Sequence, residues 1–381
     1  MKVAPWVVSI SCGLGVTLAL FAQKDSGITA GSPGKITTVP STPADANSQE
    51  SPAEPEFKIG VQQVVAPVSV LNKNGDLVDG IEPSRFRLYD NGVAQNIAVD
   101  VSVQPISVVI AIQQSDRVEA VLTQIRKIGP MIQPLVTGDN GEAAVISFDS
   151  RIQEKTSFTN DPDKLVKAIN SIHAGNTPSR MIDAVERGVS MLHNRPANRR
   201  RIILLISETR DVSSEARLRE TLINAQLNNV TVYTIDISRL VTSLTSKPQP
   251  PAPDPFPPAA RNLPGPSPST PTTVAQAYQI GNSVEFIPLL KEIYLGVKRV
   301  FVENPAEVLS ESTGGTQFGF HKQHGLEDAI ESLSHEIHNQ YLLTYTPTNL
   351  KEGGFHEIRV DIDMPNLTVR TRPGYFIGGG K

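Results

Sequence analysis

Cysteine is almost absent from this chain, because Cys12 is its only cysteine among 381 residues. Cys12 lies in an apolar stretch close to the N-terminus, so a chain cleaved after that stretch has no cysteine at all. Such a chain forms no disulfide and no thiolate metal site, and its stability has to come from a packed core. The length suffices for a large core and leaves room for roughly two domains.

An excess of charge of one sign is also missing. The formal net charge is −4 and the isoelectric point is near 6.0. Nucleic-acid binding needs a basic face, so no nucleic-acid partner is expected. The basic triplet Arg199-Arg200-Arg201 comes directly before an apolar strand and is interpreted as a solvated loop.

Several catalytic signatures are absent as well. The chain has no Gly-x-Ser-x-Gly elbow, no P-loop and no Gly-x-Gly-x-x-Gly after its first buried strand. Asp149 and Asp211 are interpreted as turn-capping residues and not as a catalytic pair. The sequence therefore predicts a protein that is not an enzyme. A metal-dependent hydrolase is the alternative, supported only by two histidine pairs, His321/His324 and His335/His338, which are interpreted as surface residues.

Three segments differ in composition from the rest. Residues 1–23 combine Lys2, an apolar run and the small residue Ala22, which predicts a secretory signal peptide. Residues 24–56 contain almost no large apolar side chain and are expected to form a disordered linker. Residues 247–273 are proline-rich and are expected to be an exposed insertion. The protein is therefore expected to be secreted or periplasmic in a bacterium, and membrane-bound only if the signal stays uncleaved.

The remaining chain divides into three parts by pattern. Residues 57–103 predict a β segment, with Asn-Gly turns and with Pro67 marking an edge strand or a bulge. Residues 104–340 alternate apolar strands with amphipathic helices, which predicts a mostly parallel sheet covered on both faces. Residues 341–377 predict a C-terminal β segment that packs with residues 57–103. The strands expected in the α/β part are 108–112, 143–148, 202–207 and 230–235, and the helices are 117–133, 161–171, 178–193, 214–228, 287–301, 306–312 and 326–338. Asp161 and Ser214 are expected to cap two of these helices.

An ordered set of motifs resembles the bacterial family of secreted proteins related to the von Willebrand factor type A domain. These motifs are VSVLNKNGDLVDGIEPSRFRLYDNG, the turn after Ile112, GNTPSRMIDAV, IILLISETRD, STGGTQF, EIHNQYLLTYTPTN, HEIRVDI and VRTRPGYF. The resemblance implies an α/β, Rossmann-like type A domain with a smaller β-sandwich-like domain built from the N- and C-terminal flanking segments. It implies no catalytic activity.

The resemblance also places a metal-ion-dependent adhesion site, which this chain keeps only in degenerate form. The family's Asp-x-Ser-x-Ser turn corresponds to Gln113, Ser115 and Arg117, its threonine to Thr177, and its distal aspartate to Glu208. One acid and one base sum to about zero charge, and a guanidinium near the metal position repels a dication. No cofactor is therefore expected, with Mg²⁺ as a weak possibility.

Two readings of Arg117 stay open at this point. In one, Arg117 takes the metal's place and pairs with Glu208, with Ser115 and Thr177 as hydrogen-bond partners. In the other, the site has decayed and Arg117 points to solvent. In both, the expected function is a noncatalytic protein-binding module for an unknown protein ligand of the cell envelope or exterior. A membrane-tethered envelope scaffold is a further alternative.

Overall fold

Six strands form one sheet. Its central strands carry apolar side chains on both faces, and these can be buried only when helices cover both sides of the sheet. The strand order is β10-β9-β8-β5-β6-β7, with parallel neighbours except at the antiparallel edge strand β7. The strands are β5 (Ile106–Gln113), β6 (Glu142–Phe148), β7 (Ile152–Thr159), β8 (Arg200–Ser207), β9 (Val230–Asp236) and β10 (Gln317–Gly319). Every residue of the central strand β5 is buried.

The structure is a computed structural model that describes residues 63–100, 104–245, 283–295, 302–319, 325–349 and 352–377. The chain divides into two compact units, Met1–Lys58 and Ile59–Lys381, and every described residue belongs to the second. The expected signal peptide 1–23, linker 24–56 and insertion 247–273 lie outside the described residues, as do His321 and His324. Within the described ranges, no helix is long and apolar enough to cross a membrane.

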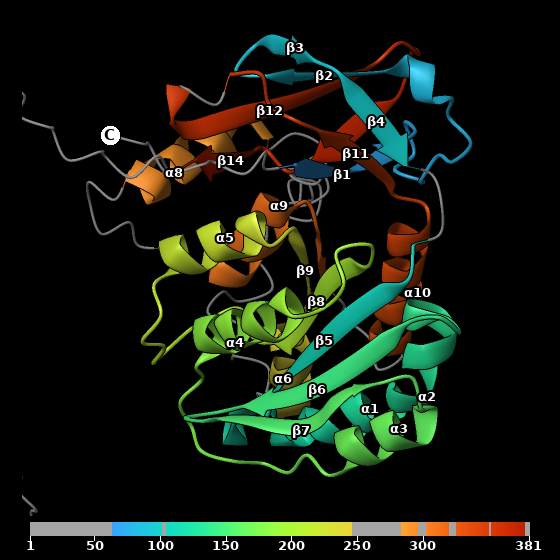
Figure 1. Cartoon of the computed structure of the whole chain (residues 1–381). Coiled ribbons are helices and arrows are strands. Elements are labelled where there is room, and N and C mark those ends of the chain that lie inside the picture. Colours follow the sequence, from blue (N-terminus) through green and yellow to red (C-terminus); the bar gives the residue numbers. More distant parts are fainter. Residues whose placement is uncertain are drawn as a thin grey trace, which may run out of the picture. The chain divides into compact units, whose positions relative to one another are not determined.

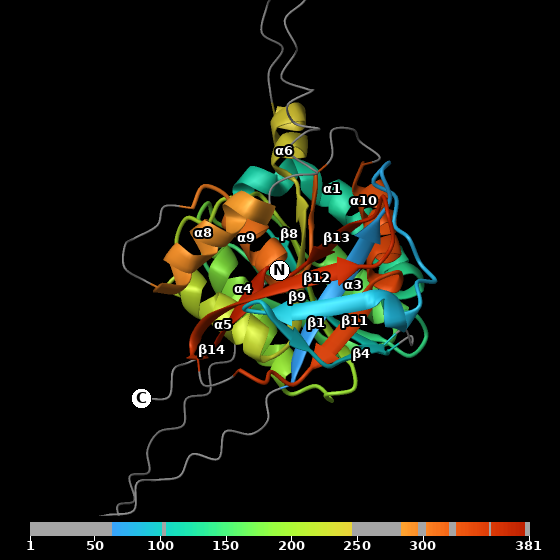
Figure 2. The ribbon, with the colours of Figure 1, turned by 90° about the horizontal axis from the view of Figure 1, so that it is seen from above.

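Helices cover both faces of the six-stranded sheet (Figures 1 and 2) and close a separate hydrophobic core on each. One face carries η2 (Asp116–Val121), α1 (Leu122–Lys127), α2 (Gly129–Met131), η3 (Ile132–Thr137), α3 (Pro162–Asn170), α6 (Ser238–Thr245) and α10 (Gly325–His338). The other face carries α4 (Met181–His193), α5 (Leu218–Leu227), α8 (Ser283–Leu295) and α9 (Pro305–Thr313).

The helix expected over residues 117–133 is wrong as a single element. The chain there forms a 3₁₀ turn (η2), two short α segments and a π-helical turn (η3) in succession. Pro130 and Pro134 each lack the N–H that a continuous helix requires, which explains the interruptions. The helix α6 and the strand β7 were not expected from the sequence, and no residue of β7 is fully buried to mark it as a core strand.

The chain before β5 and the chain after α10 form two further sheets with a shared hydrophobic core. Their orders are β13-β1-β11-β4 and β14-β12-β2-β3, and every pair in both sheets that spans the two segments is antiparallel. The elements are β1 (Val64–Leu71), η1 (Pro83–Arg85), β2 (Phe86–Asp90), β3 (Val93–Gln95), β4 (Ile97–Asp100), β11 (Tyr341–Tyr345), β12 (Gly354–Ile362), β13 (Thr368–Thr371) and β14 (Gly374–Ile377). The fold class indicated by the sequence, a Rossmann-like α/β domain with a sandwich made from flanking segments, is confirmed.

Pro67 does not mark an edge strand, contrary to expectation. It lies in β1, which pairs with β11 on one side and β13 on the other. The ladder to β13 begins only at Val68, so Pro67 stands beyond its end. Gly314 occupies that place instead, and a Cβ there would lie 3.2 Å from the proline ring. An interior strand therefore accommodates the proline because a glycine, and not a strand, faces its ring.

The basic triplet Arg199-Arg200-Arg201 is not a solvated loop. Arg199 Nε donates to Ser107 Oγ at 2.8 Å, and Arg200 donates through a terminal nitrogen to Gln340 Oε1 at 2.8 Å. Arg201 donates to two backbone carbonyl groups. The guanidinium groups of Arg199 and Arg200 therefore bind oxygen atoms at the start of β5 and just after α10, and that of Arg201 binds carbonyl groups after α4 and after α5, so all three are used inside the fold.

The sandwich and the α/β part are joined by polar and aromatic contacts. Glu336 of α10 accepts a hydrogen bond from Ser69 of β1 and forms an ion pair of 2.5 Å with Arg370 of β13. Tyr294 of α8 stacks on Phe376 of β14 with ring centroids 5.7 Å apart. These contacts come from both flanking segments, so the sandwich packs on the helices that border the sheet.

The side chain of Glu311, in α9, leads to a prediction about how the stability of the protein depends on pH. Burial, together with Glu307, raises the pKa of Glu311 to about 7. An acid whose pKa rises on folding loses stability as the pH increases from its unfolded value of about 4.5 through 7. Glu311→Gln should therefore unfold at a higher temperature than wild type at pH 8, by about 1–2 kcal/mol in stability, with no gain at pH 4.5. Thermal unfolding at both pH values measures this.

The matched control is Glu331→Gln, which removes a carboxylate from an exposed position of α10. It should leave the pH dependence of the unfolding temperature unchanged. A gain from Glu311→Gln of equal size at pH 4.5 and pH 8 would contradict the assignment of the pKa.

Candidate functional site

The candidate site lies where two parallel strands end side by side. Gln113 is the last residue of β5, and Glu208 directly follows β8, the neighbour of β5 in the sheet. Open α/β sheets bind ligands at this edge because the loops there diverge and leave a crevice. The structure brings Gln113, Ser115, Arg117 and Glu208 together at this place.

Gln113 joins the two strand ends through its amide group. Its Oε1 accepts from the backbone N–H of Glu208 at 2.8 Å. Its Nε2 donates to Ser115 Oγ at 2.8 Å and to Glu208 Oε2 at 3.2 Å. Gln113 is 1% exposed, and these bonds use both N–H groups and the oxygen atom of its buried amide. The family's aspartate has no N–H with which to make the last two contacts.

Arg117 and Glu208 form a bidentate ion pair. Arg117 Nε lies 2.9 Å from Glu208 Oε2, and a terminal guanidinium nitrogen lies 2.8 Å from Oε1. The hydrogen bond and the charge of Glu208 raise the pKa of Arg117. The arginine side chain is 63% exposed and the glutamate side chain only 12%. Of the two readings of Arg117, the structure contains the ion pair, with the outer side of the guanidinium open to solvent.

Ser115 and Thr177 were expected to be the hydrogen-bond partners of the Arg117–Glu208 pair, but their hydroxyl groups bond to other residues. Ser115 bonds to Gln113, and Thr177 Oγ1 donates to Asp116 Oδ2 at 3.0 Å. Asp116, which stands between Ser115 and Arg117 in the turn, was not expected to have a role. The only available signal was its carboxylate within that turn. Thr177 therefore stays beside the site through Asp116 and not through Arg117.

A divalent cation does not fit this set of donors. Both carboxylate oxygens of Glu208 already accept from Arg117, and one also accepts from Gln113. The N–H groups of Gln113 and Arg117 face Glu208, whereas Mg²⁺ requires oxygen ligands. In the described part of the chain, no three metal-ligating side chains of His, Cys, Asp or Glu come together. His338, from one of the histidine pairs noted in the sequence, contacts the backbone carbonyl of Leu135 at 3.0 Å.

Asp211 supports the site from the loop that follows Glu208. Its Oδ1 accepts from the backbone N–H groups of Met181 and Ile182 at 2.7 and 3.2 Å, at the start of α4. Ser214, expected to cap α5, instead donates to Asp211, and α5 begins after Arg217 without a side-chain cap. Asp211 therefore caps a helix distant in sequence, consistent with its interpretation as a capping residue.

Asp211→Ala should destabilise the protein by about 1–2 kcal/mol, because the backbone N–H groups of Met181 and Ile182 in the first turn of α4 lose their side-chain acceptor. Asp211→Asn keeps an oxygen in place and should recover most of the loss. Urea unfolding of both variants makes the measurement. Equal losses from alanine and asparagine would show that the charge, and not the cap, is what matters.

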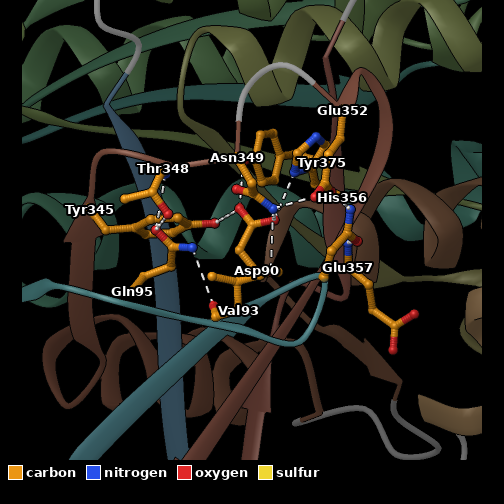
Figure 3. A network of polar contacts seen from close by, with 11 residues as sticks. Asp90, Val93, Gln95, Tyr345, Thr348, Asn349, Glu352, His356, Glu357 and Tyr375 are labelled. Atoms are coloured by element: carbon orange, nitrogen blue, oxygen red, sulfur yellow. Dashed lines mark hydrogen bonds and ion pairs between the residues drawn. The ribbon is translucent and has the colours of Figure 1, made fainter.

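A second polar centre lies inside the sandwich (Figure 3) and was not foreseen from the sequence. Asp90 accepts from the hydroxyls of Tyr345 and Tyr375 at 2.8 and 2.7 Å, and from Asn349 Nδ2 at 3.1 Å. His356 Nδ1 lies 2.7 Å from Asp90 Oδ1, and the side chains of both residues are 0% exposed. Burial, with the nearby carboxylate, raises the pKa of both tyrosines, so they stay hydrogen-bond donors. The centre joins side chains of β2, β11, β12 and β14 inside the sandwich.

One family model matches a central part of this chain. Residues 108–210 match the family model of the von Willebrand factor type A domain. These residues span β5 to the loop after Glu208 and include the whole candidate site. Over residues 108–210 the chain therefore carries a von Willebrand factor type A domain. Domains of this family are protein-interaction and adhesion modules and are typically noncatalytic.

Solved structures with a similar fold include bacterial proteins. The conserved hypothetical protein BatB from Bacteroides thetaiotaomicron is 16% identical over 34% of this chain and 66% of its own, with a TM-score of 0.31. An aerotolerance-related membrane protein from Bacteroides fragilis is 12% identical over 60% of this chain and 98% of its own, with a TM-score of 0.37. The von Willebrand factor domain of the pilus tip protein Mfa5 from Porphyromonas gingivalis is 16% identical over 29% and 43%, with a TM-score of 0.24. No curated protein matches this chain.

Proposed function

We propose that this chain is an exported, noncatalytic protein-binding module whose ligand face is the strand-end edge around Gln113, Ser115, Arg117, Thr177 and Glu208. The observation that supports this most is the Arg117–Glu208 pair, which puts a fixed, 63% exposed guanidinium side chain where the family's cation would stand. A guanidinium offers several donors in one plane and suits the recognition of carboxylate oxygens. Binding then proceeds without a cofactor.

The loop after Glu208 adds an apolar contact to this face. Val212 is 69% exposed, the highest value among the large hydrophobic side chains in the described ranges that stand out to solvent. Its backbone N–H donates to the carbonyl of Ser179, which fixes the loop against the start of α4. An exposed apolar side chain on the loop that follows Glu208, the partner of a fixed cation, is a combination that protein interfaces use. The partner is expected among proteins of the bacterial envelope or exterior.

Export follows from the composition of residues 1–23, and with it a secreted or periplasmic location. N-terminal sequencing of the protein recovered outside the cytoplasm tests this part. A new N-terminus close to residue 24 supports cleavage. An intact Met1 in a membrane fraction would contradict cleavage and support the membrane-tethered scaffold instead.

Site-specific photo-cross-linking tests the binding face in the producing cells. A benzophenone amino acid at position 212 should give a discrete cross-linked partner band, and Arg117→Ser in the same background should reduce it several-fold. The matched control is the same amino acid at Met364, which is 42% exposed on the turn between β12 and β13. Equal bands from positions 212 and 364, or none from 212, would contradict the proposed face.

A further inference from the structure

A polar cavity of about 220 Å³ opens next to the candidate site. Three segments line it: the residue after β5, the β6–β7 hairpin and the loop after α3, whose elements lie together in Figure 1. The lining residues are Gln114, Asp149, Arg151, Gln153, Lys155, Ser171, His173, Ala174, Gly175 and Asn176. It is distinct from the Arg117–Glu208 pair, since none of the five residues of the candidate site lines it.

The floor of the cavity is rigid and already satisfied. Asp149 is 1% exposed and accepts from the backbone N–H groups of Arg151 and Asn176 at 2.8 and 3.0 Å, and from Gln114 Nε2 at 3.3 Å. Burial acts to raise the pKa of Asp149, but these hydrogen bonds outweigh it and keep the pKa below its usual value. A Cβ at Gly175 would lie 2.1 Å from Asp149 Oδ2, so only glycine lets the loop close over the carboxylate.

The wall of the cavity carries more positive than negative charge. Arg151 and Lys155 contribute two cations from β7 and its turn, against the single carboxylate of Asp149. Lys155 Nζ donates to Gln153 Oε1 at 2.9 Å, a neutral partner that leaves its charge uncompensated. The lining therefore has a net charge of +1 (two minus one, with His173 neutral), which favours an anion of one charge.

The size of the cavity selects among such anions. Pockets for metabolite-sized ligands hold roughly 300–1,000 Å³ and are mostly apolar, whereas this cavity is smaller and polar. A single carboxylate side chain fits both the space and the charge. We propose that the cavity receives an aspartate or glutamate side chain of the protein bound at the candidate site. The inference rests on the proposed function and adds the chemistry of the partner.

The test titrates the full chain, labelled with ¹⁵N-histidine, with N-acetyl-glutamate amide and follows the ring signals of His173. His173→Gln assigns these signals by their loss. The glutamate compound should shift them, and its neutral counterpart N-acetyl-glutamine amide should not. Arg151→Gln and Lys155→Gln should each weaken binding about fivefold, the usual upper effect of one partly exposed charge pair. Arg85→Gln, which removes an exposed arginine from the sandwich, should leave it unchanged.

Two results would overturn the inference: no response of His173 to the glutamate compound, or an equal response to inorganic phosphate, which would mark a general anion site. The proposed function fails separately, because cross-linking from position 212 does not depend on the cavity. A partner captured there with an unresponsive His173 overturns only the inference drawn here. A responsive His173 without any captured partner overturns the proposed function, and with it the assignment of the carboxylate to a protein partner, and leaves only a carboxylate-binding cavity.

Discussion

Asp90→Ala should lower the free energy of unfolding by about 3–5 kcal/mol, because it leaves several buried hydrogen-bond donors without their shared acceptor. The carboxylate is the shared acceptor of Tyr345, Tyr375 and His356, and these residues come from β11, β14 and β12. Without Asp90, three donors stay buried without a partner, and each costs free energy as an unsatisfied group. Urea unfolding followed by circular dichroism measures the loss.

Asp363→Ala is the matched control for this substitution. Asp363 stands in the same part of the molecule, with a side chain that is 70% exposed and 3.9 Å from Arg85. Its loss should change stability by no more than about 0.5 kcal/mol. If Asp90→Ala were as mild as Asp363→Ala, the network of Figure 3 would not hold the sandwich together.

The double variant Gln113→Asp/Arg117→Ser should bind Mn²⁺ with a dissociation constant of roughly 10⁻⁴–10⁻³ M, while the wild type binds none measurably. The substitutions remove the guanidinium and return a carboxylate and a hydroxyl to the edge where Ser115 and Glu208 remain. The local charge becomes more negative by two, which favours a dication by Coulomb attraction. Calorimetric titration with MnCl₂ measures binding.

The single variant Gln113→Asp, with Arg117 retained, is the control for charge against geometry. Its new carboxylate is expected to pair with the guanidinium, so it should bind no metal. Stoichiometric binding of Mn²⁺ by the wild type would contradict both the ion pair as an obstacle to metal and the proposal of a cofactor-free site.

The central strands of the α/β part, and their alternation with helices, were predictable because each of these strands is an apolar run between polar turns. Burial of both faces leaves no other arrangement for β5 or β8 than a parallel sheet under helices. The half-exposed edge strand β7 escaped because a strand at an edge has no such requirement. The broken helix after Arg117 shows that apolar periodicity alone does not overcome two prolines.

The hydrogen-bond partners were not predictable in the same way. The ion pair itself was predictable, because the sequence places a base, Arg117, and an acid, Glu208, at the ends of neighbouring strands. The partners of the other side chains were not. Thr177 belongs to a loop whose path depends on Gly175 closing over Asp149, and that path carries it to Asp116. The contacts of Ser214 with Asp211 depend likewise on how two loops meet.

By itself, the sequence determined the class of fold and the edge of the sheet where the candidate site lies. These follow from local pattern, since periodicity and residue chemistry act over a few neighbouring positions. Only the tertiary structure decided that Arg199 to Arg201 are used inside the fold, that Asp90 gathers donors from three strands, and that a cationic cavity flanks the site. These arrangements join residues far apart in the chain, and their geometry exists only once the backbone has packed.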